Sequence, residues 1–179
     1  MKTLAQQMAV YNAYHQNERN KATHFVGVPL IILALLIPMS WAAIEIGSMR
    51  ISAAMLFVAI VGVWYVRLDL ALGLLTLAAV APLLWAADMI AAQGAVTGWI
   101  VFGVTFVGGW ILQLIGHAIE GRRPALVDNF LQIFVAPVFL VAEALFHFGV
   151  RLDLKNEIDA LTVTTPASPR ASQSASSTI

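Results

Sequence analysis

Histidine is the residue type in this chain best suited to metal chemistry, because the 179 residues include four histidines and no cysteine. His15 and His24 precede the first long apolar segment, and His117 lies near the end of a later one, three positions before Glu120. Neutral imidazoles with a carboxylate are the usual ligands of non-haem Fe(II), and three histidines also suit Zn²⁺. Iron would favour oxygen chemistry, whereas zinc would favour hydrolysis by activated water. These residues predict a metal site; the simpler alternative is that they only form hydrogen bonds near a membrane interface.

The spacing of these residues limits how they can meet. His15 and His24 are nine positions apart, so on one straight helix they would face opposite sides. The polar stretch Asn17–Asn20 between them allows a bend that would bring the two rings together. His117 and Glu120 are three positions apart and therefore share one helix face.

The surrounding sequence is that of an integral membrane protein. Hydrophobic residues make up 60% of the chain and charged residues 11%, too few charges for the surface of a soluble domain of this size. The formal net charge of zero gives no indication of a nucleic-acid partner. We expect an all-α fold, a polytopic transmembrane helical bundle of about four or five spans embedded in the lipid bilayer. The apolar segments cover residues 25–46, 51–66, 70–91, 98–119 and 130–148.

Two further segments flank the apolar ones. Residues 3–16 carry apolar side chains at helical spacing, which predicts an N-terminal amphipathic helix. Residues 155–179 are rich in Ser, Thr, Ala and Pro, which predicts a disordered C-terminal tail. The expected domain organisation is therefore a membrane-embedded domain over residues 1–154 and a tail over residues 155–179.

Alternation of the spans places the histidines relative to the membrane. If four segments alternate in direction, the start of the first and the end of the fourth face the same side, so His15, His24 and His117 should lie at one membrane surface. The positive-inside rule places Arg122 and Arg123 there too, with the N-terminus cytoplasmic. These two arginines are either topological anchors, or one of them holds a substrate carboxylate in a bidentate pair.

The fifth apolar segment, 130–148, is ambiguous because a fifth span would put Arg151 and Lys155 outside, against the same rule. It either spans the membrane or is embedded only partly. Glu143 within it is a proton-transfer or metal group, or the buried partner of an arginine. Three glycines, Gly108, Gly109 and Gly116, are expected to be helix-packing positions.

Two motifs resemble those of a known family. Residues 14–29 read YHQNERNKATHFVGVP, and residues 109–132 read GWILQLIGHAIEGRRPALVDNFLQ. Together they resemble the small membrane family of Fe(II)-dependent 2-hydroxy fatty acid dioxygenases, whose fungal members act in phytosphingosine breakdown at the endoplasmic reticulum. The likeness extends over roughly residues 10–150, hydrophobic layout included.

The resemblance implies a set of functional residues and a reaction. It implies that His15, His24 and His117 bind Fe(II). Glu120 is an additional candidate ligand, although it follows the histidine one residue sooner than in the fungal pattern. The implied reaction converts a 2-hydroxy fatty acid and O2 to an acid one carbon shorter, CO2 and water, without 2-oxoglutarate, NAD or flavin. Arg122 or Arg123 would offset the charge of the substrate carboxylate. The candidates to orient the metal-bound histidines are Gln113, Asp128 and Asn129.

Other function classes fit parts of the sequence. A small membrane transporter or channel would account for Glu143, a non-catalytic membrane scaffold for the tail, and a zinc-dependent membrane hydrolase for the histidines. The composition favours a bacterial inner membrane, or the endoplasmic reticulum if the protein is eukaryotic. The sequence gives no indication of the oligomeric state.

Overall fold

Helices dominate the computed structural model, which describes residues 3–121, 124 and 131–164. Within that part of the chain, three helices are long and apolar enough to cross a membrane: α2 (Glu18–Trp41), α4 (Leu70–Ala92) and α5 (Ala95–Glu120). A shorter apolar helix, α3 (Ala53–Leu68), precedes α4. The expected all-α membrane bundle is therefore confirmed.

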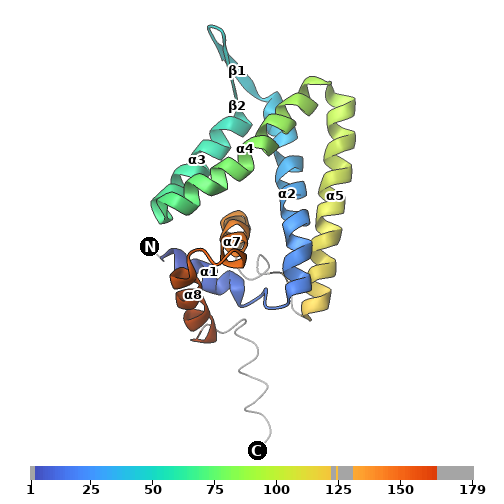
Figure 1. Cartoon of the computed structure of the whole chain (residues 1–179). Helices are drawn as coiled ribbons and strands as arrows, with labels where there is room; N and C mark the ends of the chain where they lie inside the picture. Colours follow the sequence, from blue (N-terminus) through green and yellow to red (C-terminus); the bar gives the residue numbers. More distant parts are fainter. Residues whose placement is uncertain (1–2, 122–123, 125–130, 165–179) are drawn as a thin grey trace, which may run out of the picture.

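The long helices form two pairs that diverge from each other. Figure 1 shows α2 and α5 side by side in one pair, and α3 and α4 side by side in another that leans away from it. Three shorter helices lie at the open end between the pairs: α1 (Leu4–Asn12), α7 (Gln132–His147) and α8 (Leu152–Thr164). Since α2 and α5 run in opposite directions, the start of α2 and the end of α5 meet at the same end of the bundle.

Glycines allow α2 and α5 to approach each other closely. A Cβ atom on Gly109 would lie 2.7 Å from Ile31 Cγ1 and 2.9 Å from the carbonyl oxygen of Gly27, and one on Gly116 would overlap the side chains of Asn20 and Thr23. The prediction that these two glycines are packing positions is confirmed. It is wrong for Gly108, because no described residue lies within 4 Å of the position of its Cβ.

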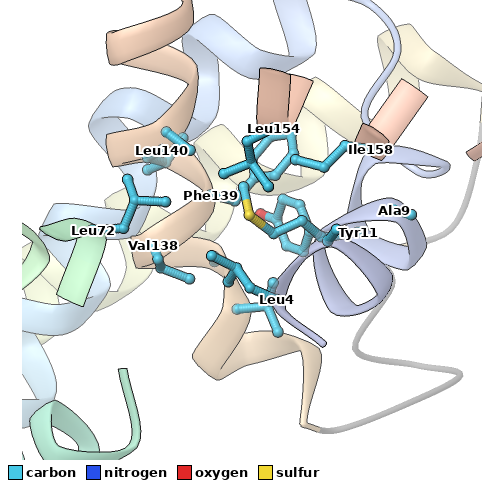
Figure 2. Packing of buried hydrophobic residues seen from close by; sticks show 14 of the residues in the cluster. Leu4, Ala9, Tyr11, Leu72, Val138, Phe139, Leu140, Leu154 and Ile158 are labelled. Atoms are coloured by element: carbon cyan, nitrogen blue, oxygen red, sulfur yellow. The ribbon is translucent and has the colours of Figure 1, made fainter. Parts of the chain in front are cut away.

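The fifth apolar segment forms helix α7, which covers the base of the bundle. Its buried face contributes Val138 and Phe139, and Figure 2 shows Phe139 beside Tyr11 of α1 and near Leu154 and Ile158 of the last helix. Helices α7 and α8 meet at an angle of 120°. Together they would form a broken span or a re-entrant element, so α7 is not one straight transmembrane helix.

The expected disordered tail begins too early, because α8 continues through residue 155 to Thr164. Leu154 and Ile158 lie one turn apart and are both buried against α1. The Asn12 side-chain amide also donates to Asp159 and Thr162. The LxxxI spacing of Leu154 and Ile158 stabilises this helix, and it precedes the Ser- and Pro-rich stretch from which the tail was predicted. Residues 165–179 lie outside the described residues.

A second difference is a β-hairpin that begins within the first expected apolar segment, residues 25–46, and ends within the second, residues 51–66. Helix α2 ends at Trp41, five residues before the expected end, and strands β1 (Ala43–Ile46) and β2 (Met49–Ser52) pair antiparallel. Gly47 in the turn has a φ of 63°, which glycine adopts at little cost. The β-branched residues Ile44, Ile46 and Ile51 favour strands, although their hydrophobicity made them resemble span residues.

Candidate metal centre

Three of the four histidines converge at the end of the bundle where α2 begins and α5 ends. His15 lies in the turn after α1, His24 on the second turn of α2, and His117 on the last turn of α5. One ring nitrogen from each lies within 4.8 Å of the others, and all three residues are buried. The predicted bend between His15 and His24 is present, but it lies at residues 13–17 and not along Asn17–Asn20, because Asn17 caps α2 and residues 18–20 form its first turn. His147, at the exposed end of α7, is not part of this group.

The hydrogen bonds around two of these rings fix where their protons lie. Nδ1 of His15 is 2.7 Å from the carbonyl oxygen of Tyr11, and Nδ1 of His24 is 2.9 Å from the carbonyl oxygen of Asn20. A carbonyl oxygen only accepts hydrogen bonds, so each Nδ1 carries a proton and donates it. In the neutral rings, Nε2 of His15 and Nε2 of His24 then present lone pairs to each other across 3.1 Å. Lone pairs at that distance repel unless a cation lies against both.

Protonation does not remove this conflict. Burial, with smaller contributions from the neighbouring His24 and His117, lowers the pKa of His15 to about 2. Among the described residues, His117 also has no hydrogen-bond partner for its buried Nδ1. Three neutral imidazoles whose free nitrogens face one another are what a borderline transition-metal ion such as Fe(II) or Zn²⁺ binds, so the donor set fits a metal.

Aromatic residues hold His15 in position. The Tyr11 ring stacks on the imidazole with centroids 4.0 Å apart and an angle of 8° between the planes, and Phe139 of α7 contacts both rings. Tyr11 therefore supports His15 with its ring as well as with its carbonyl oxygen. The sequence prediction included Tyr11 only as part of the amphipathic helix over residues 3–16, although its position four residues before His15 was a usable signal.

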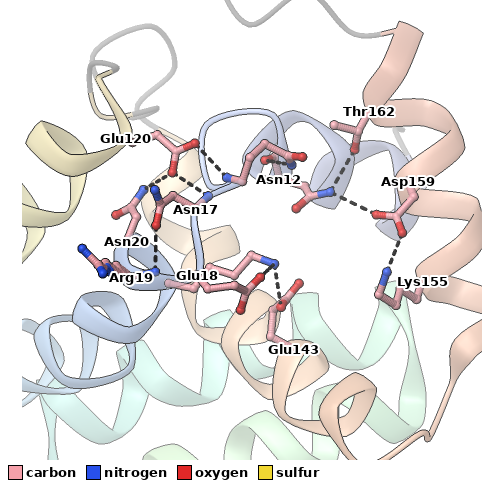
Figure 3. Close-up of polar contacts among 12 residues, drawn as sticks. Asn12, Asn17, Glu18, Arg19, Asn20, Glu120, Glu143, Lys155, Asp159 and Thr162 are labelled. Carbon is pink, nitrogen blue, oxygen red and sulfur yellow. Dashed lines mark hydrogen bonds and ion pairs between the residues drawn. The ribbon is translucent and has the colours of Figure 1, made fainter.

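Glu120 connects the three histidine-bearing segments without joining the histidine group. Its Oε1 accepts from the backbone N–H of Gln16 at 3.0 Å, and its Oε2 accepts from the N–H of Asn17 at 2.9 Å and from the Asn20 amide at 3.1 Å (Figure 3). Asn20 in turn accepts the His24 Nδ1–H with its carbonyl oxygen. The carboxylate on α5 thus fixes the turn that carries His15 and the residue that orients His24.

A half-buried ion pair joins α7 to the same end of α2. Lys21 Nζ lies 3.0 Å from Glu143 Oε2, with side-chain exposures of 14% and 16%, and 3.2 Å from Glu18 Oε1. Glu143 is therefore the partner of a cation, one of the alternatives raised by the sequence, with lysine in place of arginine. The pair holds α7, and with it Phe139, over His15.

An apolar cavity of about 230 Å³ opens from the histidines into the space between the helix pairs. Both His24 and Leu36 line it. These two residues are twelve positions apart on α2, so the cavity extends about 18 Å along this helix. Apolar side chains from α3, α4 and α7 form most of the remaining wall. Two amide side chains, Gln113 of α5 and Gln132 of α7, also line this cavity.

Gln113 is the one predicted orienting residue that the structure describes. It lies one turn before His117 and is buried. The other predicted residues, Arg122, Arg123, Asp128 and Asn129, lie outside the described residues.

Comparison with known proteins gives one family. The family model for Mpo1-like proteins, described as 2-hydroxy-palmitic acid dioxygenase Mpo1-like, matches residues 1–148. The Saccharomyces cerevisiae protein named 2-hydroxy-palmitic acid dioxygenase MPO1 is 34% identical to this chain over 158 residues, which cover 87% of each protein. No solved structure matches the chain.

Proposed function

The chain belongs to the Mpo1-like family of 2-hydroxy-palmitic acid dioxygenases, and from this premise we propose that it is a membrane-bound, Fe(II)-dependent dioxygenase of 2-hydroxy fatty acids. The observation that carries the proposal is the group of three buried histidines whose free nitrogens face one another. The matched segment, residues 1–148, includes all three of them.

We propose His15, His24 and His117 as the metal ligands. Tyr11 and Asn20 orient the first two by accepting their Nδ1–H groups, which keeps each Nε2 free to bind. Glu120 is better suited to positioning than to ligation, because both of its oxygens already accept hydrogen bonds. Bound Fe(II) would supply the one-electron chemistry that lets O2 react with an organic acid.

The cavity supports the choice of substrate. A long acyl chain matches its apolar wall, and the cavity begins at the histidines, so the polar head of the acid would lie next to them. Arg122 or Arg123 would offset the substrate carboxylate, as inferred from the sequence. The reaction balances without a further reductant: the hydroxy acid and O2 give an acid one carbon shorter, CO2 and water. The aliphatic wall would keep bulk water from the reacting head group.

We further propose that the metal centre faces the cytoplasm, with a bacterial inner membrane as the host membrane favoured by composition. The chain contains no cysteine, so single cysteines report topology directly. Glu18 at the start of α2, with a side chain 84% exposed, and the exposed Ser48 in the hairpin mark opposite ends of α2. A membrane-impermeant maleimide should label Ser48→Cys in intact cells and Glu18→Cys only after lysis. The reverse pattern would contradict the orientation.

The decisive test is oxygen uptake by the detergent-solubilised protein. The protein is loaded anaerobically with Fe(II) and given 2-hydroxypalmitic acid, and product mass is read in parallel. We expect uptake matched by an acid one carbon shorter, with no activity and no bound iron in His117→Ala. His147→Ala is the matched control and should retain both. Folded, iron-loaded protein without uptake would overturn the proposed activity, and iron retained by His117→Ala would overturn the ligand assignment.

A further inference from the structure

Two amide side chains interrupt the apolar wall of the cavity. Gln113 and Gln132 are 7% and 5% exposed, and they come from helices on different sides of the cavity. Gln113 lies one helical turn from His117 on the same face of α5, so the two side chains begin about 6 Å apart. Both amides therefore line the cavity that begins at the metal centre.

The described residues leave these two amides short of hydrogen-bond partners. The Oε1 atom of Gln132 is buried and has no hydrogen-bond partner among the described residues. The described part of the chain also provides no hydrogen bond to the Gln113 amide, whose nitrogen lies near Gly27 at the α2–α5 crossing. A buried amide without a partner destabilises the folded state. An unpartnered amide oxygen of Gln132 in the same cavity as the Gln113 amide is best explained by a ligand that supplies the missing partner.

The chemistry of the proposed substrate matches this need. A carboxylate only accepts hydrogen bonds, a hydroxyl group donates one, and an amide offers both a donor and an acceptor. Resting on the proposed function, we infer that Gln113 and Gln132 recognise the head group of the substrate. The Gln132 carbonyl accepts a hydrogen bond from the 2-hydroxyl group, and the Gln113 amide N–H donates to the carboxylate.

This assignment makes Gln132 the residue that distinguishes a 2-hydroxy acid from the plain acid. A fatty acid without the hydroxyl group would leave Oε1 buried and unpaired. Sites built to hydrogen-bond a substrate hydroxyl discriminate strongly against analogues that lack it. Gln113 would contribute equally to both acids, because both carry the carboxylate.

The test measures binding of 2-hydroxypalmitic acid and palmitic acid to the full-length, Fe(II)-loaded protein under anaerobic conditions, where no turnover occurs. We expect Gln132→Met to lower the preference for the hydroxy acid about tenfold, the size of one lost hydrogen bond. Gln113→Met should weaken the binding of both acids about tenfold and leave the preference for the hydroxy acid unchanged. Gln93→Met, at an exposed position outside the cavity, is the control.

Two further readouts separate this inference from the proposed function. Iron content should be unchanged in Gln132→Met and Gln93→Met, and neither Met substitution in the cavity should lower the thermal midpoint, because each removes a buried amide. Gln132→Asn, which retracts the amide by one methylene group, should reproduce the loss of preference. An unchanged preference in iron-loaded Gln132→Met and Gln132→Asn would overturn the inference and leave the dioxygenase assignment intact. Wild-type protein that neither binds iron nor consumes O2 would instead contradict the proposed function itself.

Discussion

The two ends of the α2–α5 helix pair are built differently. At the histidine end, polar side chains are buried and joined across segments: Asn20 and Glu120 link α2 to α5, and their hydrogen bonds extend to the turn before α2. At the opposite end, the Trp41 ring packs into the space left by Gly98, and the hairpin beyond it exposes most of its residues. Figure 1 shows this hairpin projecting from the end of the bundle away from α1, α7 and α8.

The difference indicates which end of the helix pair is built for chemistry. Burying polar groups is unfavourable unless each finds a partner, so a buried polar network persists where it has a use. Exposed residues at the hairpin end carry no such cost. Substitutions at the histidine end should therefore affect metal binding or stability strongly, whereas substitutions at the hairpin end should affect stability slightly and leave the metal bound.

The largest effect is expected from removing a proposed metal ligand. His24→Ala should lose all bound iron, because two imidazoles cannot hold Fe(II) as three can. Iron content by elemental analysis checks this. In wild-type protein, a chelator should lower the thermal midpoint, since metal bound only to the folded state stabilises it. The same chelator should leave the midpoint of His24→Ala unchanged; an equal shift in both proteins would show that the histidines are not the site.

Gly116→Ala is expected to have the second largest effect. The new methyl group would overlap Asn20 and Thr23, so α5 must move away from α2 and take His117 out of the group. We expect loss of most bound iron and a lower thermal midpoint. Gly108→Ala on the same helix is the matched control, because no described residue lies within 4 Å of its Cβ position. Both changes raise helix propensity equally, so a difference between them measures packing alone. Equal behaviour of the two variants would refute the close contact.

The third prediction concerns Glu120, which orients ligands in our assignment. Glu120→Gln replaces one accepting oxygen by an NH2 group that faces an N–H donor, which should loosen the turn carrying His15. Metal affinity should fall about 10–100-fold, as for other residues that orient ligands. Co(II) binding followed by its visible spectrum gives both affinity and coordination. An unchanged spectral shape is expected; an altered one would make Glu120 a direct ligand.

Much of the arrangement of the three histidines was predictable from the sequence. Alternating spans place the start of α2 and the end of α5 at one surface, and the polar stretch between His15 and His24 predicts the bend that brings those two rings together. The orienting contacts were not predictable, because they depend on tertiary packing. Nothing in the spacing of Glu120 shows that its oxygens accept N–H groups from a turn more than one hundred residues earlier.

The two errors in the fold have a common physical origin. Hydrophobicity alone assigned Ile44 and Ile46 to a membrane span, although β-branched residues next to a Gly-Ser turn favour a hairpin. Average composition assigned residues after 154 to a tail, although Leu154 and Ile158 are spaced to pack one helix face on α1. In both cases the local spacing of apolar residues contained more information than their number.

The fourth prediction tests the ion pair that holds α7 over the centre. Lys21→Met would leave Glu143 charged and half-buried without its close partner, and should lower the free energy of unfolding by about 3 kcal/mol. The double variant Lys21→Met with Glu143→Leu removes both charges and should recover most of that loss. Chemical denaturation in detergent measures each step. No recovery in the double variant would mean that the two side chains do not interact.

The smallest effect is expected at the hairpin end. Arg50 lies 3.6 Å from Asp88 and donates a hydrogen bond to the Ser40 carbonyl oxygen, but its side chain is 45% exposed, so water partly screens its charge. Arg50→Ala should lower the free energy of unfolding by about 1–2 kcal/mol, because a partly exposed ion pair contributes little and one hydrogen bond about 1 kcal/mol. Iron content and turnover should equal those of the wild type, since the change lies at the far end of α2 from the three histidines. Loss of iron in Arg50→Ala would show that the two ends are coupled through α2 and would contradict the independence of the histidine end from the hairpin end.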